Sequence, residues 1–189
     1  MNDGSDPHIL DKQTDEIVGT LNSDKAVYVE AKRKDTLDNQ NIFDFTANAK
    51  IDKASLLEKR NRLVIQDEDG FFREYIIVYA ERHNHSEKIV QSNASIIDLA
   101  KAKTIEPQTL QGATSASATD FALLGTEWQV GVIDYTFIRT IQIKEYTNPL
   151  AVLRRIASTF DLEIRYRVEI KGNKITGRFW TYLGLTPNR

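Results

Sequence analysis

Short apolar segments separated by turn-forming residues run through residues 8–93, and this pattern constrains the fold more than any other. Ile42, Phe43, Phe45 and Ala47 lie close to period-two spacing, which is typical of a half-buried strand. Arg62–Gln66 and Phe71–Glu81 flank Asp67–Gly70, whose Asp-Gly pair supplies the positive φ of a tight hairpin. Other expected strands are Ile9–Leu10, Glu16–Leu21, Ala26–Ala31 and Lys88–Asn93. Strands this short and closely spaced predict a small β-barrel or sandwich.

The pattern changes near residue 95, where helical signals begin to alternate with strands. Asn148-Pro149 is a strong helix start, followed by an apolar stripe that includes Leu150, Leu153, Ala157 and Phe160. Further expected elements are a helix at 95–100, a loop at 111–119, a helix at 119–124 that Gly125 ends, and strands at 137–143, 162–170 and 175–182. We therefore predict a mainly β chain with a β-barrel-like domain at 1–94 and an α+β domain at 95–189.

Composition excludes several classes of function. The formal net charge is -2, which gives no electrostatic case for binding nucleic acid or an anionic membrane surface. The chain has no cysteine, so neither a disulfide framework nor a thiolate site is available. Neither a secretory signal nor an apolar run of membrane-spanning length is present. We expect no membrane anchor.

Candidate chemical sites are weak. His83 and His85 have the spacing of a metal pair on a strand, but Asn84 and Ser86 favour a solvated turn and no third ligand is evident. Asp67–Gly70 lacks the full ligand spacing of a calcium loop, and strands flank it. Ser115 and Ser117 have no identifiable histidine partner. We therefore expect no catalytic residue, no cofactor and no metal.

Two features remain as candidates for an interface or for a structural role. Trp128 follows the helix-ending Gly125, where a lone tryptophan is either a core residue or a binding platform. Arg165 and Arg167 alternate along one predicted strand with Tyr166 between them, and Arg178 lies on the next strand. These arginines form either the solvent face of a half-buried sheet or an interface rich in Arg and Tyr, with a nucleic-acid surface as a third alternative.

Several motifs, in order along the chain, resemble one family. They are His8-Ile-Leu-Asp-Lys-Gln with Glu16–Leu21, Asn39-Gln-Asn-Ile-Phe-Asp-Phe-Thr, Asn61-Arg-Leu-Val-Ile with Arg73-Glu-Tyr-Ile-Ile-Val, Leu124-Gly-Thr-Glu-Trp-Gln-Val-Gly, and Thr147-Asn-Pro-Leu-Ala-Val-Leu with Phe160-Asp-Leu-Glu-Ile. Together they resemble the N-terminal part of phage tail proteins of the tail-associated lysin and prophage endopeptidase tail type. The resemblance spans nearly the whole chain, and its most recognisable motif contains Trp128.

The resemblance implies a baseplate-hub fold in which a first barrel is followed by an inserted α+β domain. A further hub barrel and a C-terminal region would then lie beyond residue 189. It also implies a structural protein of the virion, made in the bacterial host cytoplasm and placed at the tail tip, where it docks the tail end to the distal tail protein. Expected partners are other copies of itself (a homotrimer in the full-length family), the distal tail protein ring, and the tail tube or tape measure protein.

Two other functions remain open. A cell-wall-degrading tail endopeptidase would need its active site within these residues, although family members can carry a lytic domain further downstream. A carbohydrate-binding receptor module would use Trp128 and the Arg-Tyr face. Because no set of residues supports peptide hydrolysis, we expect this region to act by assembly and not as an enzyme.

Overall fold

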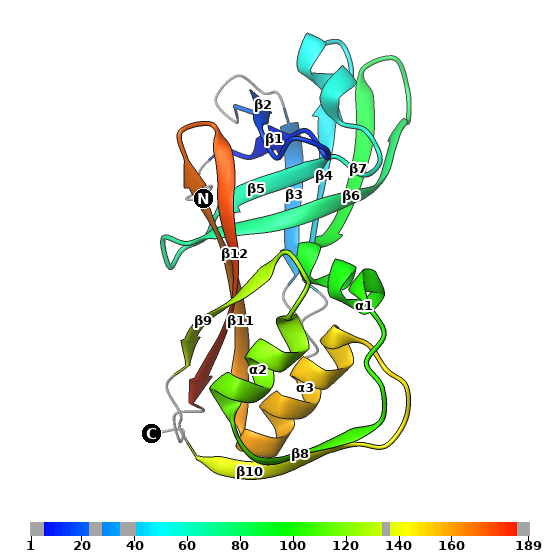
Figure 1. Cartoon of the computed structure of the whole chain (residues 1–189). Coiled ribbons are helices and arrows are strands. Elements are labelled where there is room, and N and C mark those ends of the chain that lie inside the picture. The colour runs from blue at the N-terminus through cyan, green and yellow to red at the C-terminus, as the bar shows by residue number, and fades with distance from the viewer. Residues whose placement is uncertain (1–5, 23–27, 35–40, 134–136, 185–189) are drawn as a thin grey trace. The chain divides into compact units, whose positions relative to one another are not determined.

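The computed structural model describes residues 6–22, 28–34, 41–133 and 137–184 (Figure 1). The chain divides into two compact units. The first comprises Met1–Ser95 and Val168–Thr176, and the second Ile96–Arg167 and Gly177–Arg189. The fold is mainly β, with a curled half-barrel sheet and a small second sheet. Two long strands, β11 (Leu162–Lys171) and β12 (Lys174–Gly184), begin in one unit and end in the other, so the second unit is not one continuous stretch of chain.

The first unit is built from antiparallel strands. These are β1 (His8–Leu10), β2 (Ile17–Thr20), β3 (Tyr28–Lys34), β4 (Ile42–Asn48), β5 (Arg62–Gln66), β6 (Phe72–Arg82) and β7 (Glu87–Ala94). Strand order runs β2-β1-β5-β6, and β6 also pairs with β7, which pairs with β4, which pairs with β3. Short 3-10 helices follow β4 (Asp52–Leu56) and β7 (Ser95–Asp98).

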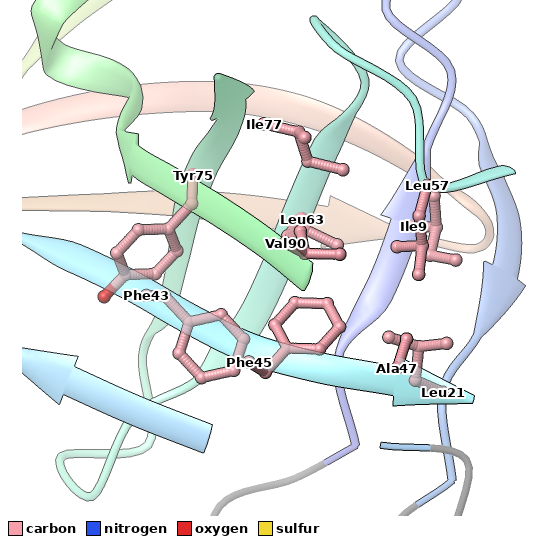
Figure 2. Packing of buried hydrophobic residues seen from close by; sticks show 10 residues of the cluster. All are labelled: Ile9, Leu21, Phe43, Phe45, Ala47, Leu57, Leu63, Tyr75, Ile77 and Val90. Atoms are coloured by element: carbon pink, nitrogen blue, oxygen red, sulfur yellow. The ribbon is translucent and has the colours of Figure 1, made fainter. Parts of the chain in front are cut away.

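Strand β4 supplies the centre of this unit's core (Figure 2). Its residues alternate as the sequence predicts, with Phe43, Phe45 and Ala47 buried and their neighbours partly exposed. The Phe43 ring centroid lies 5.4 Å from that of Phe45 and 5.8 Å from that of Tyr75 on β6. Burying such side chains provides the main stabilisation of the curled sheet.

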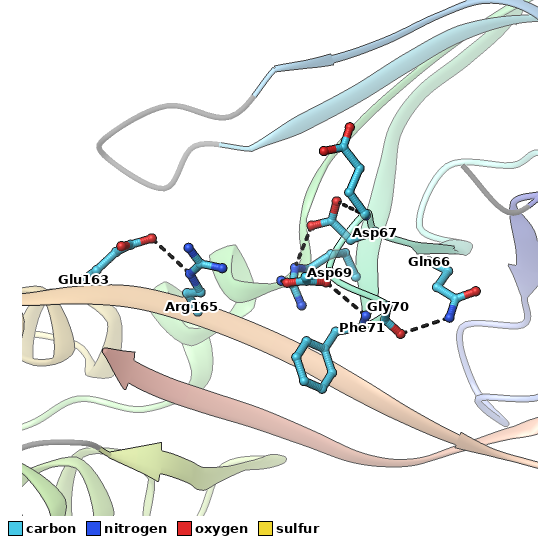
Figure 3. Close-up of polar contacts among 9 residues, drawn as sticks. Gln66, Asp67, Asp69, Gly70, Phe71, Glu163 and Arg165 are labelled. Atoms are coloured by element: carbon cyan, nitrogen blue, oxygen red, sulfur yellow. Dashed lines mark hydrogen bonds and ion pairs between the residues drawn. The ribbon is translucent and has the colours of Figure 1, made fainter. Parts of the chain in front are cut away.

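The β5–β6 hairpin forms where Asp-Gly predicts it. Gly70 has a φ of +79°, and the Gly70 amide donates to the Asp67 carbonyl at 2.9 Å. Arg73 is buried and pairs with the carboxylates of Asp67 (3.4 Å from Nε) and Asp69 (Figure 3). The acidic tip is therefore held by an arginine of its own hairpin, as a structural feature and not as a calcium loop.

The second unit combines helices with two sets of strands. Its elements are α1 (Leu99–Ala102), β8 (Gln108–Thr114), α2 (Ser115–Leu123), β9 (Trp128–Ile133), β10 (Ile138–Ile143), α3 (Pro149–Phe160) and the unit's parts of β11 and β12. Strands β8 and β10 pair antiparallel as a separate two-stranded sheet, whereas β9 runs parallel to β12. Helix α3 begins as predicted, with the Asn148 side chain accepting the Ala151 amide at 3.0 Å.

The sequence-based prediction of a loop at 111–119 is wrong. Strand β8 continues to Thr114, and α2 begins at Ser115. Thr114 and Ser117 form a reciprocal capping box, in which each side chain accepts the other residue's backbone N–H. Small polar residues are typical of loops, but here they are a strand end and a helix cap. Strand β9 was not predicted, because Gly131 interrupts its apolar pattern.

Candidate functional site

The segment Gly125–Gly131, the most recognisable motif in the sequence, joins α2 to β9 within the second unit. Gly125 adopts a φ of +78°, a left-handed conformation that ends the helix with little strain only for glycine. The Thr126 amide and hydroxyl both donate to the Leu123 carbonyl, at 2.9 and 2.7 Å. The Trp128 amide in turn donates to Thr126 Oγ1 at 3.2 Å. These hydrogen bonds provide partners for the Leu123 carbonyl at the end of α2 and for the Trp128 amide at the start of β9.

Trp128 is a packing residue in this segment. Its side chain is 5% exposed, and its ring centroid lies 6.3 Å from that of Tyr166, at an interplanar angle of 69°. Tyr166 itself is 2% exposed. An edge-to-face pair of this kind adds to the free energy gained from burial. The geometry fits the core alternative for Trp128 and leaves no open aromatic platform.

Gly131 allows β9 to approach β12 closely. A Cβ atom at this position would lie 2.5 Å from Thr181 Oγ1 and 3.0 Å from the Trp180 carbonyl oxygen. The pairing between β9 and β12 also shifts register here, between Trp180 and Tyr182. Glycine within a strand often marks such a close approach or bulge. The second glycine of the motif is therefore required by packing.

The three arginines do not form one exposed basic face. Arg178 is 6% exposed, and its Nη1 lies 3.4 Å from Glu127 Oε2. Arg167 is half-buried, with its guanidinium 5.3 Å from the centroid of the Phe179 ring. Arg165 is exposed, and its Nε donates to Glu163 Oε1 at 3.0 Å (Figure 3). Of the three alternatives for these arginines, a solvent face shared by all of them is wrong, because Arg178, which pairs with Trp128 across β12 and β9, is buried.

Lys103 also stabilises the end of α2, a role that the sequence does not reveal. Its ammonium group donates to the carbonyl oxygens of Phe121 (3.3 Å) and Leu124, at the C-terminal end of α2. Burial lowers the pKa of Lys103 below its ordinary value. A cation at this end of a helix satisfies carbonyl groups that lack an intrahelical partner. No local pattern links Lys103 to Phe121, which lies eighteen residues further along the chain.

The remaining candidates offer little chemistry within the described residues. His83 and His85 are exposed in the turn between β6 and β7. Ser115 is fully buried, and Ser117 belongs to the capping box. In the described part of the chain, no group of three or more His, Cys, Asp or Glu residues could hold a metal ion. None of its helices is long and apolar enough to cross a membrane.

Comparison with known proteins agrees with the motifs. Residues 102–176 match the model of the prophage endopeptidase tail domain, a range that includes Gly125–Gly131 and α3. No curated protein sequence matches the chain. Prophage tail protein gp18 from Listeria monocytogenes EGD-e is structurally similar, with a TM-score of 0.60 and 11% identity over 94% of this chain and 50% of that protein.

Two other solved structures share the fold. A tail protein from Neisseria meningitidis MC58 gives a TM-score of 0.57 at 12% identity, over 94% of this chain and 50% of that one. The prophage MuSo2 43 kDa tail protein from Shewanella oneidensis gives 0.53 at 13% identity, over 82% and 50%. The chain thus spans about half the length of the structures that it matches. Residues 102–176 thus match the prophage endopeptidase tail domain, and the chain shares the fold of these tail proteins.

Proposed function

We propose that the chain is part of a baseplate hub, a structural protein of the virion tail that sits at the tail tip. The observation that carries this proposal is the likeness to a prophage tail protein over 94% of the chain, combined with the tail-domain match at residues 102–176. In this role the protein docks the tail end to the distal tail protein ring. It also meets other copies of itself, in a trimer, and the tail tube or tape measure protein.

A downstream region is part of this proposal. The structures that the chain resembles are about twice as long as the stretch it covers. We propose that a longer protein of this kind carries host binding or cell-wall cleavage beyond the hub region. The residues described above then serve as the scaffold that positions that activity.

Assembly without catalysis is supported by the contacts that polar residues make in and around the Gly125–Gly131 segment. Thr126 and Lys103 bind the end of α2, and Glu127 pairs with the buried Arg178. Their hydrogen-bonding groups serve the joint between α2 and β9, so they are not arranged around a substrate. Likewise, burial of Trp128 argues against the carbohydrate-binding alternative at that residue.

The test uses the phage that encodes the protein. We expect the protein in purified virions by mass spectrometry, and immunogold label at the tail tip by electron microscopy. Deletion of the gene should give tails that fail to complete their tip. Intact, infectious tails from the deletion strain, or label distributed along the tube, would overturn the hub proposal.

Two biochemical tests address the partners and the enzyme alternative. Co-expression with the distal tail protein should give a complex that survives size-exclusion chromatography, and two separate peaks would count against docking. Cell-wall zymography should show no clearing. Clearing that disappears when a single His, Asp or Glu residue is substituted would replace assembly by catalysis as the function of this region.

A further inference from the structure

A shallow polar groove lies in the second unit and is lined by none of the residues of the Gly125–Gly131 segment. Its volume is about 390 Å³. Two short stretches of chain line it, one that runs from α1 to just beyond its end and one immediately before α3. The lining residues are Ala100, Lys101, Lys103, Thr104, Tyr146, Thr147 and Asn148.

The two sides of the groove are held together by the backbone. The Ile105 amide donates to the Thr147 carbonyl at 2.8 Å, and the Thr147 amide donates back to the Ile105 carbonyl at 3.0 Å. Ile105 is 4% exposed, which anchors this bridge in the core. A site whose walls are already fixed loses less conformational entropy when a ligand binds.

The groove presents one aromatic ring among hydrogen-bonding groups. Tyr146 is 68% exposed, so its ring contributes little to the core. Thr104 and Thr147 add hydroxyl groups to the lining. Asn148 uses its Oδ1 atom to cap α3, which leaves its side-chain Nδ2 as a donor. An apolar ring face with polar neighbours suits a ligand that is itself apolar on one face and polar at its edge, as a pyranose ring is.

The charge of the lining residues indicates the charge of a ligand that would fit the groove. Lys101 and Lys103 line the groove, and none of the described lining residues is acidic. The Lys103 ammonium is held at the carbonyl oxygens of Phe121 and Leu124, whereas Lys101 is exposed to solvent. Because Lys103 is held by those carbonyl groups, Lys101 is the lining cation that faces solvent, and it favours a ligand that carries phosphate or carboxylate.

We propose that this groove binds an anionic saccharide, with the sugar ring stacked on Tyr146 and its phosphate or carboxylate facing Lys101. The proposal goes beyond the hub function, which assigns host contact to a downstream region. It is also independent of tail docking, so either can fail alone. The ligand source is a free sugar phosphate or a cell-surface polymer that bears the same groups.

The test is a titration of the ¹⁵N-labelled chain with glucose 6-phosphate, glucose and inorganic phosphate, followed by NMR. We expect glucose 6-phosphate to shift the amides of 100–104 and 146–148. Glucose and inorganic phosphate should each bind at least fivefold more weakly. A phosphate-bearing wall polymer and a neutral dextran distinguish the two sources: tighter binding of the polymer than of the sugar phosphate assigns the site to the cell surface.

Substitutions test which side chains bind the ligand. Tyr146→Ala and Lys101→Gln should each weaken glucose 6-phosphate binding at least fivefold, because both side chains are exposed and neither supports the core. Lys144→Gln removes an exposed charge outside the lining and should leave binding unchanged. Absence of any shift at the lining amides would overturn the proposal. So would equal binding of glucose, or phosphate binding that is insensitive to Tyr146→Ala, since a plain anion site would suffice.

Discussion

Substitution of Gly131 by alanine tests the claim that the motif is a packing joint. The new Cβ would meet Thr181 Oγ1 at 2.5 Å and the Trp180 carbonyl oxygen at 3.0 Å. The Thr181 side chain can rotate, but the Trp180 carbonyl is backbone of β12 and can retreat only if the strand moves. Overpacking of this kind costs about 1–3 kcal/mol of unfolding free energy. For a chain of this size, each kcal/mol lowers Tm by about 2–4 °C.

The sign of this effect makes the test decisive. Where the backbone is compatible, Gly→Ala stabilises a protein by about 0.4–1 kcal/mol, because it restricts the unfolded chain. Thermal and urea unfolding, followed by circular dichroism, would measure the difference. A Gly131→Ala variant that is as stable as the parent, or more stable, would refute the close approach of β9 to β12.

Two further variants show where the cost arises. Gly19→Ala is the matched control: its nearest neighbour at 3.0 Å is the end of the flexible Leu56 side chain, so a smaller loss is expected. Adding Thr181→Ala to Gly131→Ala removes the 2.5 Å contact and should restore part of the stability. Strictly additive effects in this double-mutant cycle would show that the two positions do not meet.

Three other substitutions probe the second unit. Trp128→Ala should lower the unfolding free energy by about 3–5 kcal/mol, since the ring is 5% exposed; an equally stable variant would contradict its burial. Asn148→Ala removes the cap of α3 and should cost about 1 kcal/mol in urea unfolding. Burial raises the pKa of Tyr182, whose hydroxyl donates to the Leu153 carbonyl at 2.6 Å. The stability that this group contributes is present below its unfolded pKa of about 10 and is lost as pH rises above it. Tyr182→Phe should therefore reduce stability at pH 7 by about 1 kcal/mol and flatten the alkaline decline; an unchanged decline would exclude Tyr182 as its source.

Strands, turns and helix starts that depend on neighbouring residues could be predicted from the sequence. Period-two apolar spacing identified β4, Asp-Gly identified the β5–β6 hairpin, and Asn148-Pro149 identified the start of α3. Each depends on residues within a few positions of one another, so sequence spacing carries the physical information. Small polar residues at 111–119 misled the prediction, because Thr and Ser serve loops and helix caps through the same hydrogen bonds.

Contacts between distant segments were not predictable in the same way. Arg178 lies on a strand with a regular pattern, yet it is buried beside Trp128 because β12 pairs with β9 in a parallel register. The polar groove likewise depends on the bridge between Ile105 and Thr147, which are far apart in the chain. Pairings of this kind depend on how elements pack, and spacing along one segment does not encode them.

The sequence by itself determined the class of the fold, the main turns, the start of α3 and the resemblance to phage tail proteins. It did so because turn chemistry, capping and hydrophobic period act over a few residues. Only the tertiary structure decided that Trp128 is a core residue, that Gly131 is needed for a close strand approach, and that Lys103 binds the end of α2. Burial and close contact are properties of segments brought together by packing, and a one-dimensional pattern does not specify which segments those are.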